Sequence, residues 1–194
     1  MEYAAEPHRE EVELVHAAQR GDRDAFGRLY DISVTSVYRY LRSRLAEPSD
    51  AEDLTADVFI KAMQALPSYR HQGVPFVAWL FRIAHNELAN FRKRQSRRRE
   101  VPLEDDLPSR GLSRDDPSEA ALTRMEFSEV QGAMRELTPL QQQVVSLRFA
   151  GELSIAETAQ AMRRSQGAVK FLQHSALRAL QGKLQPKEMH GRGG

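Results

Sequence analysis

Apolar residues recur at helical spacing along most of this chain, three and four positions apart, and no stretch shows the strict alternation of a β-strand. Residues that end or begin helices divide the pattern into short segments. Gly21 closes the first segment, and Pro48, Pro67 and Pro75 separate those that follow. The sequence therefore predicts an all-α fold made of short helices.

Four helices are expected in the first half of the chain, at residues 10–20, 22–45, 49–66 and 75–99. The tetrapeptide Ser-Asp-Ala-Glu reads as a capping box in which Ser49 is the N-cap and Glu52 reaches back to it. Pro75 stands where a helix favours its first proline. These signals predict that the third helix begins at Ser49 and the fourth at Pro75.

Helical periodicity resumes at residues 120–137 and continues as three short helices up to residue 184. Thr138, Ser154 and Ser165 stand at N-cap positions, and Gly151 is placed to break the first join. The second half is therefore predicted to be a separate helical unit.

Charge separates the two helical units, although the net charge of the chain is only +1. Residues 92–99 hold six basic side chains, and residues 100–119 hold seven acids with three prolines and a glycine. We predict a helical domain at 1–99, a flexible acidic linker at 100–119, a second helical domain at 120–184 and a frayed tail at 185–194. The linker should let the two domains behave as separate bodies.

Composition excludes several classes of protein. Hydrophobic residues make up 41% and charged residues 28% of the chain, which is ordinary for a globular protein. Without cysteine there is no disulfide, thiolate nucleophile or zinc-finger ligation. No apolar run is long enough for a membrane span, and the first residues do not resemble a secretory signal. We expect a cytoplasmic protein without membrane insertion, bound metal or cofactor.

The helix expected at residues 75–99 carries an aromatic ring, amides and positive charge along one side. At about 100° per residue, its apolar side chains gather on another, broad side. Indole and guanidinium groups stack on unpaired bases, amides read base edges, and basic groups neutralise phosphates. The alternative is a solvated surface, but the combination favours nucleic acid. The candidate residues are Trp79, Arg82, Asn86, Asn90, Lys93, Arg94, Arg97 and Arg98.

Residues 154–180 have the residue pattern of a helix-turn-helix. Ile155, Ala159 and Met162 are apolar at helical spacing, and a short turn follows them. A plain helical hairpin is the alternative. In a helix-turn-helix, the start of the second helix would read base edges in the major groove of duplex DNA. The candidate residues there are Ser165, Gln166, Lys170, Phe171, Gln173 and His174.

Several segments together resemble the extracytoplasmic-function (ECF) group of the sigma-70 family of bacterial RNA polymerase sigma factors. They are GDRDAFGRLYD, AEDLTADVFIKAMQALPSYR, FVAWLFRIAHN and LTPLQQQVVSLRFAGELSIAETAQAM with GAVKFLQHSALRAL. They occur in the family's order and span about residues 10–184. The resemblance departs from the family pattern at Ala56-Asp57, at Arg163 in the turn and at Phe171-Leu172.

The resemblance implies that domain 1–99 melts the promoter and reads the −10 element, with Asn86 at the mouth of a pocket for a flipped base. It implies that domain 120–184 reads the −35 element. Partners would be promoter DNA, the clamp and flap of core RNA polymerase, and an anti-sigma factor. The helix at residues 49–66 would dock on the clamp, and one exposed side of it holds Asp53, Asp57, Ile60, Lys61 and Gln64.

Two other functions fit parts of the sequence. One is a helix-turn-helix regulator that binds duplex DNA without acting as a sigma subunit. This function would not explain why the helix at residues 75–99 carries side chains suited to unpaired bases. The other is an enzyme that uses the carboxylates around Asp53 together with His85. His85 lies off the face that holds Trp79 and Asn86, and no two histidines stand four positions apart. We therefore expect no enzymatic activity.

Overall fold

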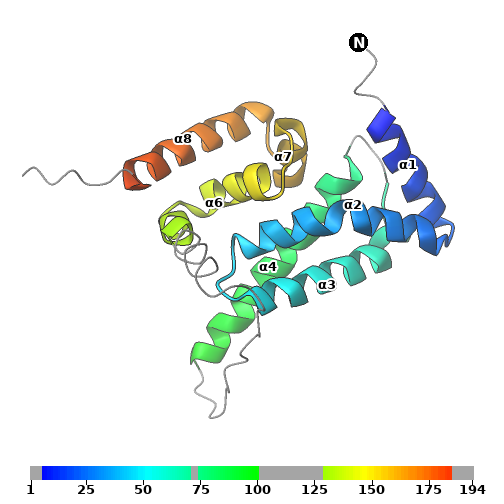
Figure 1. Ribbon diagram of the computed structural model, residues 1–194, viewed down its shortest axis with the longest axis horizontal. Coiled ribbons are helices and arrows are strands. Elements are labelled where there is room, and N and C mark those ends of the chain that lie inside the picture. The colour runs from blue at the N-terminus through cyan, green and yellow to red at the C-terminus, as the bar shows by residue number, and fades with distance from the viewer. Residues whose placement is uncertain (1–5, 71–73, 101–128, 185–194) are drawn as a thin grey trace, which may run out of the picture.

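The computed structural model describes residues 6–70, 74–100 and 129–184, and these residues form helices and no β-strand (Figure 1). The expected all-α fold is confirmed. The linker at 100–119 and the tail at 185–194 lie almost wholly outside the described residues, so their boundaries and flexibility stay predictions. The elements are α1 (Glu6–Gln19), α2 (Arg23–Arg42), α3 (Pro48–Ala65), the 3-10 turn η1 (Leu66–Ser68), α4 (Phe76–Glu100), α6 (Pro139–Val145), the π-helical turn η2 (Ser146–Ala150), α7 (Ile155–Met162) and α8 (Gln166–Leu184). Residues 129–135 are helical as well.

Local capping sets most of the helix ends. Gly21 takes φ +95° after α1, and the Asp22 carboxylate then accepts the N–H groups of Asp24 and Ala25 to begin α2. In the second half, Thr138 and Ser154 are the N-caps that the sequence predicts, and each also forms a capping box, with Gln141 and Glu157 respectively. Because these caps satisfy donors that a helix start leaves free, the short helices α6 and α7 are stabilised by their own sequence.

The expected start of α3 at Ser49 is wrong. The helix begins at Pro48, and its N-cap residue, Glu47, makes no side-chain capping bond. A proline has the backbone φ of a helix and lacks the N–H that the first turn would leave unbonded, so it suits the first helical position. Pro48 therefore starts the helix here instead of stopping the chain.

Helices α1 to α4 form the N-terminal region, residues 6–100, around a core with large aromatic side chains. Tyr40, Phe76 and Phe81 are almost completely buried. The Tyr40 and Phe81 rings meet edge to face, with their centroids 5.3 Å apart. Helix α2 packs on both α1 and α3, and α3 packs on α4. This core holds α3 and α4, the two helices with predicted functional faces, in a fixed relation.

Residues 129–184 form the C-terminal region, which has a smaller apolar core. Helix α8 packs against α6 and α7. Fully buried Val144, Val169 and Ala176 lie at the centre of this core, with Met134, Leu137, Val145 and Ala159 around them. Among the residues described in this region, no aromatic side chain is buried.

The two regions are packed against each other, which differs from the expected separate bodies. Figure 1 shows α6, α7 and α8 on one side of α2 and α4, and α7 contacts α4 directly. Three side chains of the C-terminal region, Leu147, Leu153 and Ala161, belong to the core cluster of the N-terminal region. We call this contact the seam.

Gly151 marks the tightest approach across the seam. A Cβ atom at this position would lie 2.9 Å from the Phe81 ring of α4. The backbone of Gly151 has φ −83°, which any residue adopts, and the positive φ of this turn (58°) falls on Glu152 instead. Gly151 is therefore needed for the packing of the two regions, and the expectation that it is needed for the turn is corrected.

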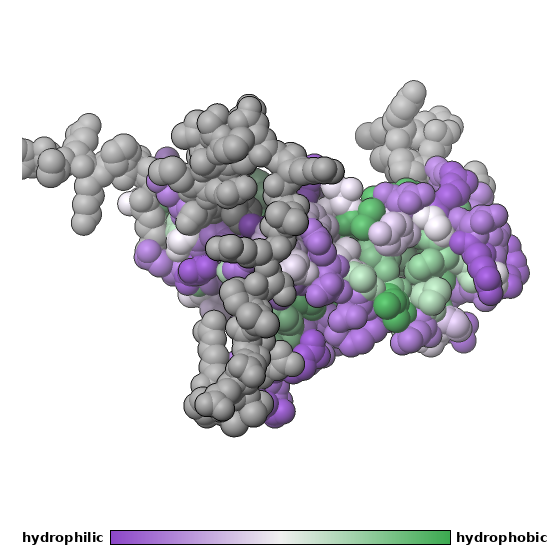
Figure 2. Space-filling model, turned by 60° about the horizontal axis from the view of Figure 1, so that its bottom comes forward, coloured by the Kyte–Doolittle hydropathy of each residue, from purple (hydrophilic) through white to green (hydrophobic). Residues whose placement is uncertain are grey.

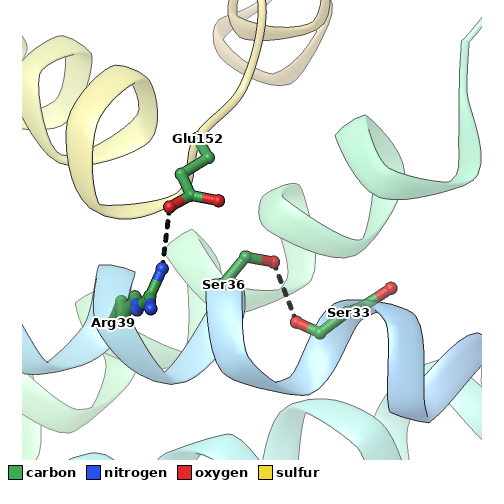
Figure 3. A network of polar contacts seen from close by, with 4 residues as sticks. All are labelled: Ser33, Ser36, Arg39 and Glu152. Carbon is green, nitrogen blue, oxygen red and sulfur yellow. Dashed lines mark hydrogen bonds and ion pairs between the residues drawn. The ribbon is translucent and has the colours of Figure 1, made fainter.

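Polar contacts complete the seam. The Arg39 guanidinium of α2 pairs with the Glu152 carboxylate at 2.7 Å (Figure 3). The Ser43 hydroxyl donates to the Ser146 hydroxyl at 2.9 Å. These contacts join residues more than 100 positions apart, so the local sequence pattern carries no sign of them.

Candidate nucleic-acid interface

The polar row predicted on α4 is exposed over its second half. Asn86, Asn90, Lys93, Arg94 and Arg97 all face solvent, while the side chain of Arg98 lies outside the described residues. No ion pair to a described residue engages Lys93, Arg94 or Arg97. Their positive charge is available to phosphates, and the Asn86 amide is free to meet a base edge.

Trp79 is half-buried in an aromatic cluster instead of standing free on this face. Its ring centroid lies 4.8 Å from that of Tyr69 and 5.5 Å from that of Phe76. The Tyr69 hydroxyl in turn donates to the Val74 carbonyl oxygen at 2.6 Å. Trp79 thus packs against the two ends of the segment that joins α3 to α4, and only part of its ring is available to a ligand.

Arg82 is engaged at the seam. Its Nε and Nη2 atoms donate to the Gln160 carbonyl oxygen of α7, at 3.1 Å and 2.6 Å. Burial, and then the nearby charge of Arg163, lower the pKa of the Arg82 guanidinium. The row on α4 is therefore interrupted where the C-terminal region packs on it.

The side of α3 predicted to face the polymerase clamp is exposed, including Asp53, Asp57, Ile60 and Gln64. The sequence reasoning missed its apolar extension. Met63 and Ile60 are 55% and 49% exposed. Figure 2 shows apolar residues gathered on one face of the N-terminal region among polar ones. Met63 stands three positions after Ile60, so helical spacing alone places it on the same side of α3.

Lys61 has a structural contact on this face. Its ammonium group forms an ion pair with Glu87 of α4, whose side chain is only 5% exposed. The same carboxylate accepts a long bond of 3.5 Å from the Asn90 amide. Glu87 sits at the edge of the apolar side of α4, and the ion pair with Lys61 accounts for an acid in that buried position.

Helix α8 presents most of its predicted residues to solvent. Gln166, Lys170, Phe171 and His174 are exposed, Phe171 at 72%. The Ser165 hydroxyl accepts the Ala168 N–H at 3.2 Å and so caps the helix. Gln173 differs from the others.

The Gln173 side chain is half-buried and accepts a hydrogen bond from Arg148 Nε at 3.0 Å. The same arginine donates to the Leu153 carbonyl oxygen. Gln173 is thus bonded within the C-terminal region and is less available to DNA than its neighbours on α8.

A hollow of about 530 Å³ connects the two candidate faces at the seam. Arg82 of α4 lies on one side of it, and Arg163, Arg164, Ser165 and Gln166 line the other. Arg163 takes the left-handed conformation (φ 52°, ψ 49°) that ends α7. The structure thus brings the start of the predicted recognition helix close to the predicted −10 row.

Comparisons with known proteins match both regions of this geometry. The family model for sigma-70 region 2 matches residues 29–98, and the model for sigma-70 region 4 matches residues 133–182. The ECF RNA polymerase sigma factor SigD of Mycobacterium tuberculosis is 31% identical over 175 residues, which cover 88% of this chain and 82% of SigD. The chain belongs to the ECF RNA polymerase sigma factors.

Two further ECF sigma factors are similar to this chain. BldN of Streptomyces coelicolor is 41% identical over 169 residues, 87% of this chain and 64% of BldN, so the chain spans less than two thirds of that relative. ShbA of Streptomyces griseus is 35% identical over 175 residues, 86% of this chain and 91% of ShbA. The resemblance drawn from the sequence motifs is confirmed.

Solved structures with the same fold include CnrH in complex with the cytosolic domain of CnrY, with a TM-score of 0.68 and 23% identity over 89% of this chain and 96% of that one. A second is the sigma factor RpoE in complex with the anti-sigma factor NepR from Bartonella quintana. It has a TM-score of 0.61 and 21% identity over 84% of this chain and 98% of that one. Both support the helical fold. Among the helices described for this chain, none is sufficiently long and apolar to span a membrane.

Proposed function

We propose that this ECF sigma factor directs core RNA polymerase to specific promoters and melts the −10 region, acting in the cytoplasm and without enzymatic activity of its own. The observation that carries the proposal is the exposed row from Asn86 to Arg97 on α4, in a region that matches sigma-70 region 2. The row places base-reading amides before a run of unpaired positive charge on one rigid helix.

The proposed division of labour on α4 follows from side-chain chemistry. Asn86 reads a flipped base, because an amide offers a donor and an acceptor to a base edge. Asn90 extends this surface, and Arg82 helps to hold the opened strand beside the exposed part of Trp79. Lys93, Arg94, Arg97 and Arg98 bind phosphates, which carry no sequence information.

The −35 element is the proposed ligand of α8. The capped start of the helix and its exposed side chains Gln166, Lys170, Phe171 and His174 fit a recognition helix in the major groove. Ser165 and Gln173 support this surface by capping the helix and by bonding to Arg148. Core RNA polymerase would hold the C-terminal region through its flap.

The polymerase clamp is the proposed partner of α3, through Asp53, Asp57, Ile60, Lys61 and Gln64. Exposed Met63 extends this face with apolar area. A mixed surface with an apolar centre and charged edges suits a stable protein interface.

Promoter binding requires the two regions to separate at the seam. The −10 and −35 elements lie about 25 base pairs apart, roughly 85 Å at 3.4 Å per base pair. In the packed arrangement, Arg82 and the start of α8 line the same hollow. Both DNA faces therefore engage together only after α7 leaves α4 and the Arg82 bonds to Gln160 break.

An anti-sigma factor is proposed as the partner that keeps the regions packed. The structure of RpoE with NepR is a complex of this kind. The exposed face of α3 and the exposed side of α8 are the surfaces that such a partner would cover, because polymerase and DNA need both. Affinity capture from uninduced cells that recovers polymerase and no other stable partner would contradict this part of the proposal.

Transcription from a promoter library with purified core RNA polymerase tests the function. Asn86→Ala should cost about 1–3 kcal/mol of promoter discrimination at one −10 position, while exposed Ser96→Ala on the same helix serves as control. Arg97→Ala with Arg98→Ala should weaken all promoters alike and lower the salt dependence by roughly one unit per lost phosphate contact. Lys170→Ala should change only −35 preference.

A regulator that binds duplex DNA without polymerase is the second candidate. It predicts that the chain does not copurify with core RNA polymerase and does not start promoter-specific RNA synthesis. If the chain fails to copurify with polymerase or fails to start promoter-specific RNA synthesis, this alternative replaces the sigma function. The same holds if Asn86→Ala weakens transcription equally at every −10 sequence.

A further inference from the structure

A small cavity of about 50 Å³ lies where the loop between α2 and α3 meets the C-terminal region. Its volume exceeds that needed by one water molecule. Three arginines line it, and they come from different elements: Arg44 from the loop, Arg92 from α4 and Arg135 from the helical residues before α6. Arg44 is partly buried, whereas Arg92 and Arg135 are exposed, so three positive charges meet at a half-open pocket that can receive a counter-ion.

Two nitrogen atoms of the Arg44 guanidinium group lack a partner. Its Nε and Nη1 atoms are buried and make no hydrogen bond, and no described acid forms an ion pair with Arg44, Arg92 or Arg135. Burial lowers the pKa of Arg44, and the charge of Arg92 adds to this effect against an opposing contribution from Tyr40. A buried and unpaired charge is costly unless a ligand of opposite charge neutralises it.

Arg92 and His85 lie beside Arg44. Arg92 Nη2 donates to the Arg44 carbonyl oxygen at 2.9 Å, which holds the second guanidinium beside the first. His85 is half-buried next to them, with its Nδ1 atom 3.3 Å from the Tyr40 hydroxyl. Burial, followed by the charges of Arg44 and Arg92, lowers the pKa of His85. The two charged side chains that act on His85 are therefore both cations.

We propose that this cavity binds a phosphate-type oxyanion through Arg44 and Arg92, and that the bound anion stabilises the packed arrangement of the two regions. Arginine presents donors in a planar fork that matches phosphate oxygens in a bidentate manner. Arg135 and Gln142 line the cavity from the other side of the seam. The site is complete only while both regions contribute to it.

Hydrogen bonds across the seam hold the two walls together. Gln131 Nε2 donates to the carbonyl oxygens of Leu45 at 2.7 Å and Arg42 at 3.2 Å. This bond links the loop that carries Arg44 to the helix that carries Arg135. An anion that binds only when the two regions are packed shifts the equilibrium between packed and separated regions toward the packed form.

Calorimetric titration of the full chain with inorganic phosphate tests the site, with sodium chloride at matched ionic strength as the reference. Arg44→Met keeps the aliphatic volume and removes the charge. It should raise the phosphate dissociation constant about tenfold or more and leave thermal stability without phosphate unchanged or higher. Arg20→Gln removes an exposed arginine outside the cavity and should bind phosphate as the wild type does. No phosphate binding by the wild type, or equal binding by Arg44→Met, overturns the proposal.

Gly151→Leu tests the link to the packed arrangement. It keeps every arginine of the cavity but places a side chain against the Phe81 ring, so the regions should separate and phosphate binding should weaken. Circular dichroism checks that the helices are retained. If Gly151→Leu loses helix content, Arg39→Glu is the second variant, because charge repulsion at this exposed pair should weaken the seam. Unchanged phosphate affinity in a folded, separated variant overturns the link.

Duplex DNA of random sequence distinguishes the two sources of such a phosphate. If the natural ligand is the DNA backbone, Arg44→Met weakens binding of this duplex by the same factor as binding of inorganic phosphate. If the ligand is a free anion, affinity for the duplex is unchanged while phosphate affinity falls. Both results retain the oxyanion site. Because neither measurement uses polymerase, the outcome is independent of the proposed sigma function.

Discussion

The N-terminal and C-terminal regions are both helical, but they are stabilised differently. The N-terminal region buries Tyr40, Phe76 and Phe81 in its own core, whereas the C-terminal region exposes its two described aromatic residues, Phe149 and Phe171. The C-terminal region relies instead on two capping boxes and on Leu147, Leu153 and Ala161 at the seam. From this difference we expect the N-terminal region to be the more stable by itself and the C-terminal region to gain more stability from its neighbour.

Phe81→Ala should have the largest effect, because Phe81 belongs to the N-terminal core and contacts the seam. Its loss should cost about 3–5 kcal/mol of unfolding free energy, through the removed ring and the cavity left behind. The matched control is Phe171→Ala, whose ring is 72% exposed and should contribute little. Urea unfolding followed by circular dichroism measures both. Similar losses in the two variants would contradict the contrast between the regions.

Lys61→Met tests a buried charge within the N-terminal region. The change removes the partner of the Glu87 carboxylate, which is 5% exposed, and should cost about 1–3 kcal/mol. The double variant with Glu87→Met should recover much of this loss, because no unpaired carboxylate remains. The same urea experiment applies. Full stability of Lys61→Met would show that Lys61 is free for another partner.

Each capping box should stabilise the C-terminal region by about 1 kcal/mol. Thr138→Ala and Ser154→Ala each remove a hydroxyl that accepts a backbone N–H at a helix start. Hydrogen exchange should show faster opening of α6 or α7 while α2 and α3 keep their protection. Ser49→Ala is the control, since Ser49 does not cap α3. Equal acceleration in both regions would mean that they unfold as one unit.

The Arg39–Glu152 pair should have the smallest effect on stability, about 0.2–1 kcal/mol, because both side chains are more than half exposed. Arg39→Glu should shift the chain toward separated regions, which small-angle X-ray scattering detects as a larger radius of gyration. Exchange of the two charges, Arg39→Glu with Glu152→Arg, should restore the compact form. A radius that does not respond to either change would exclude a role for this pair at the seam.

Local sequence signals predicted the features that depend on neighbours in the chain. The helical periodicity, the N-caps at Thr138 and Ser154 and the exposure of Asn86 and Lys170 need only residues within a few positions. The predicted start of α3 was wrong because two local signals competed. Pro48 at the first helical position prevailed over a capping box at Ser49.

The sequence by itself therefore determined the helical class, the order of the sigma-70 segments and the polar row on α4, since each follows from periodicity and side-chain type. Only the tertiary structure decided that Gly151 meets Phe81, that Lys61 pairs with Glu87 and that Arg82 bonds to Gln160. These contacts join residues 26 to 78 positions apart. Contacts of that separation depend on the three-dimensional packing of whole helices, and helical periodicity reports only which side of each helix is apolar.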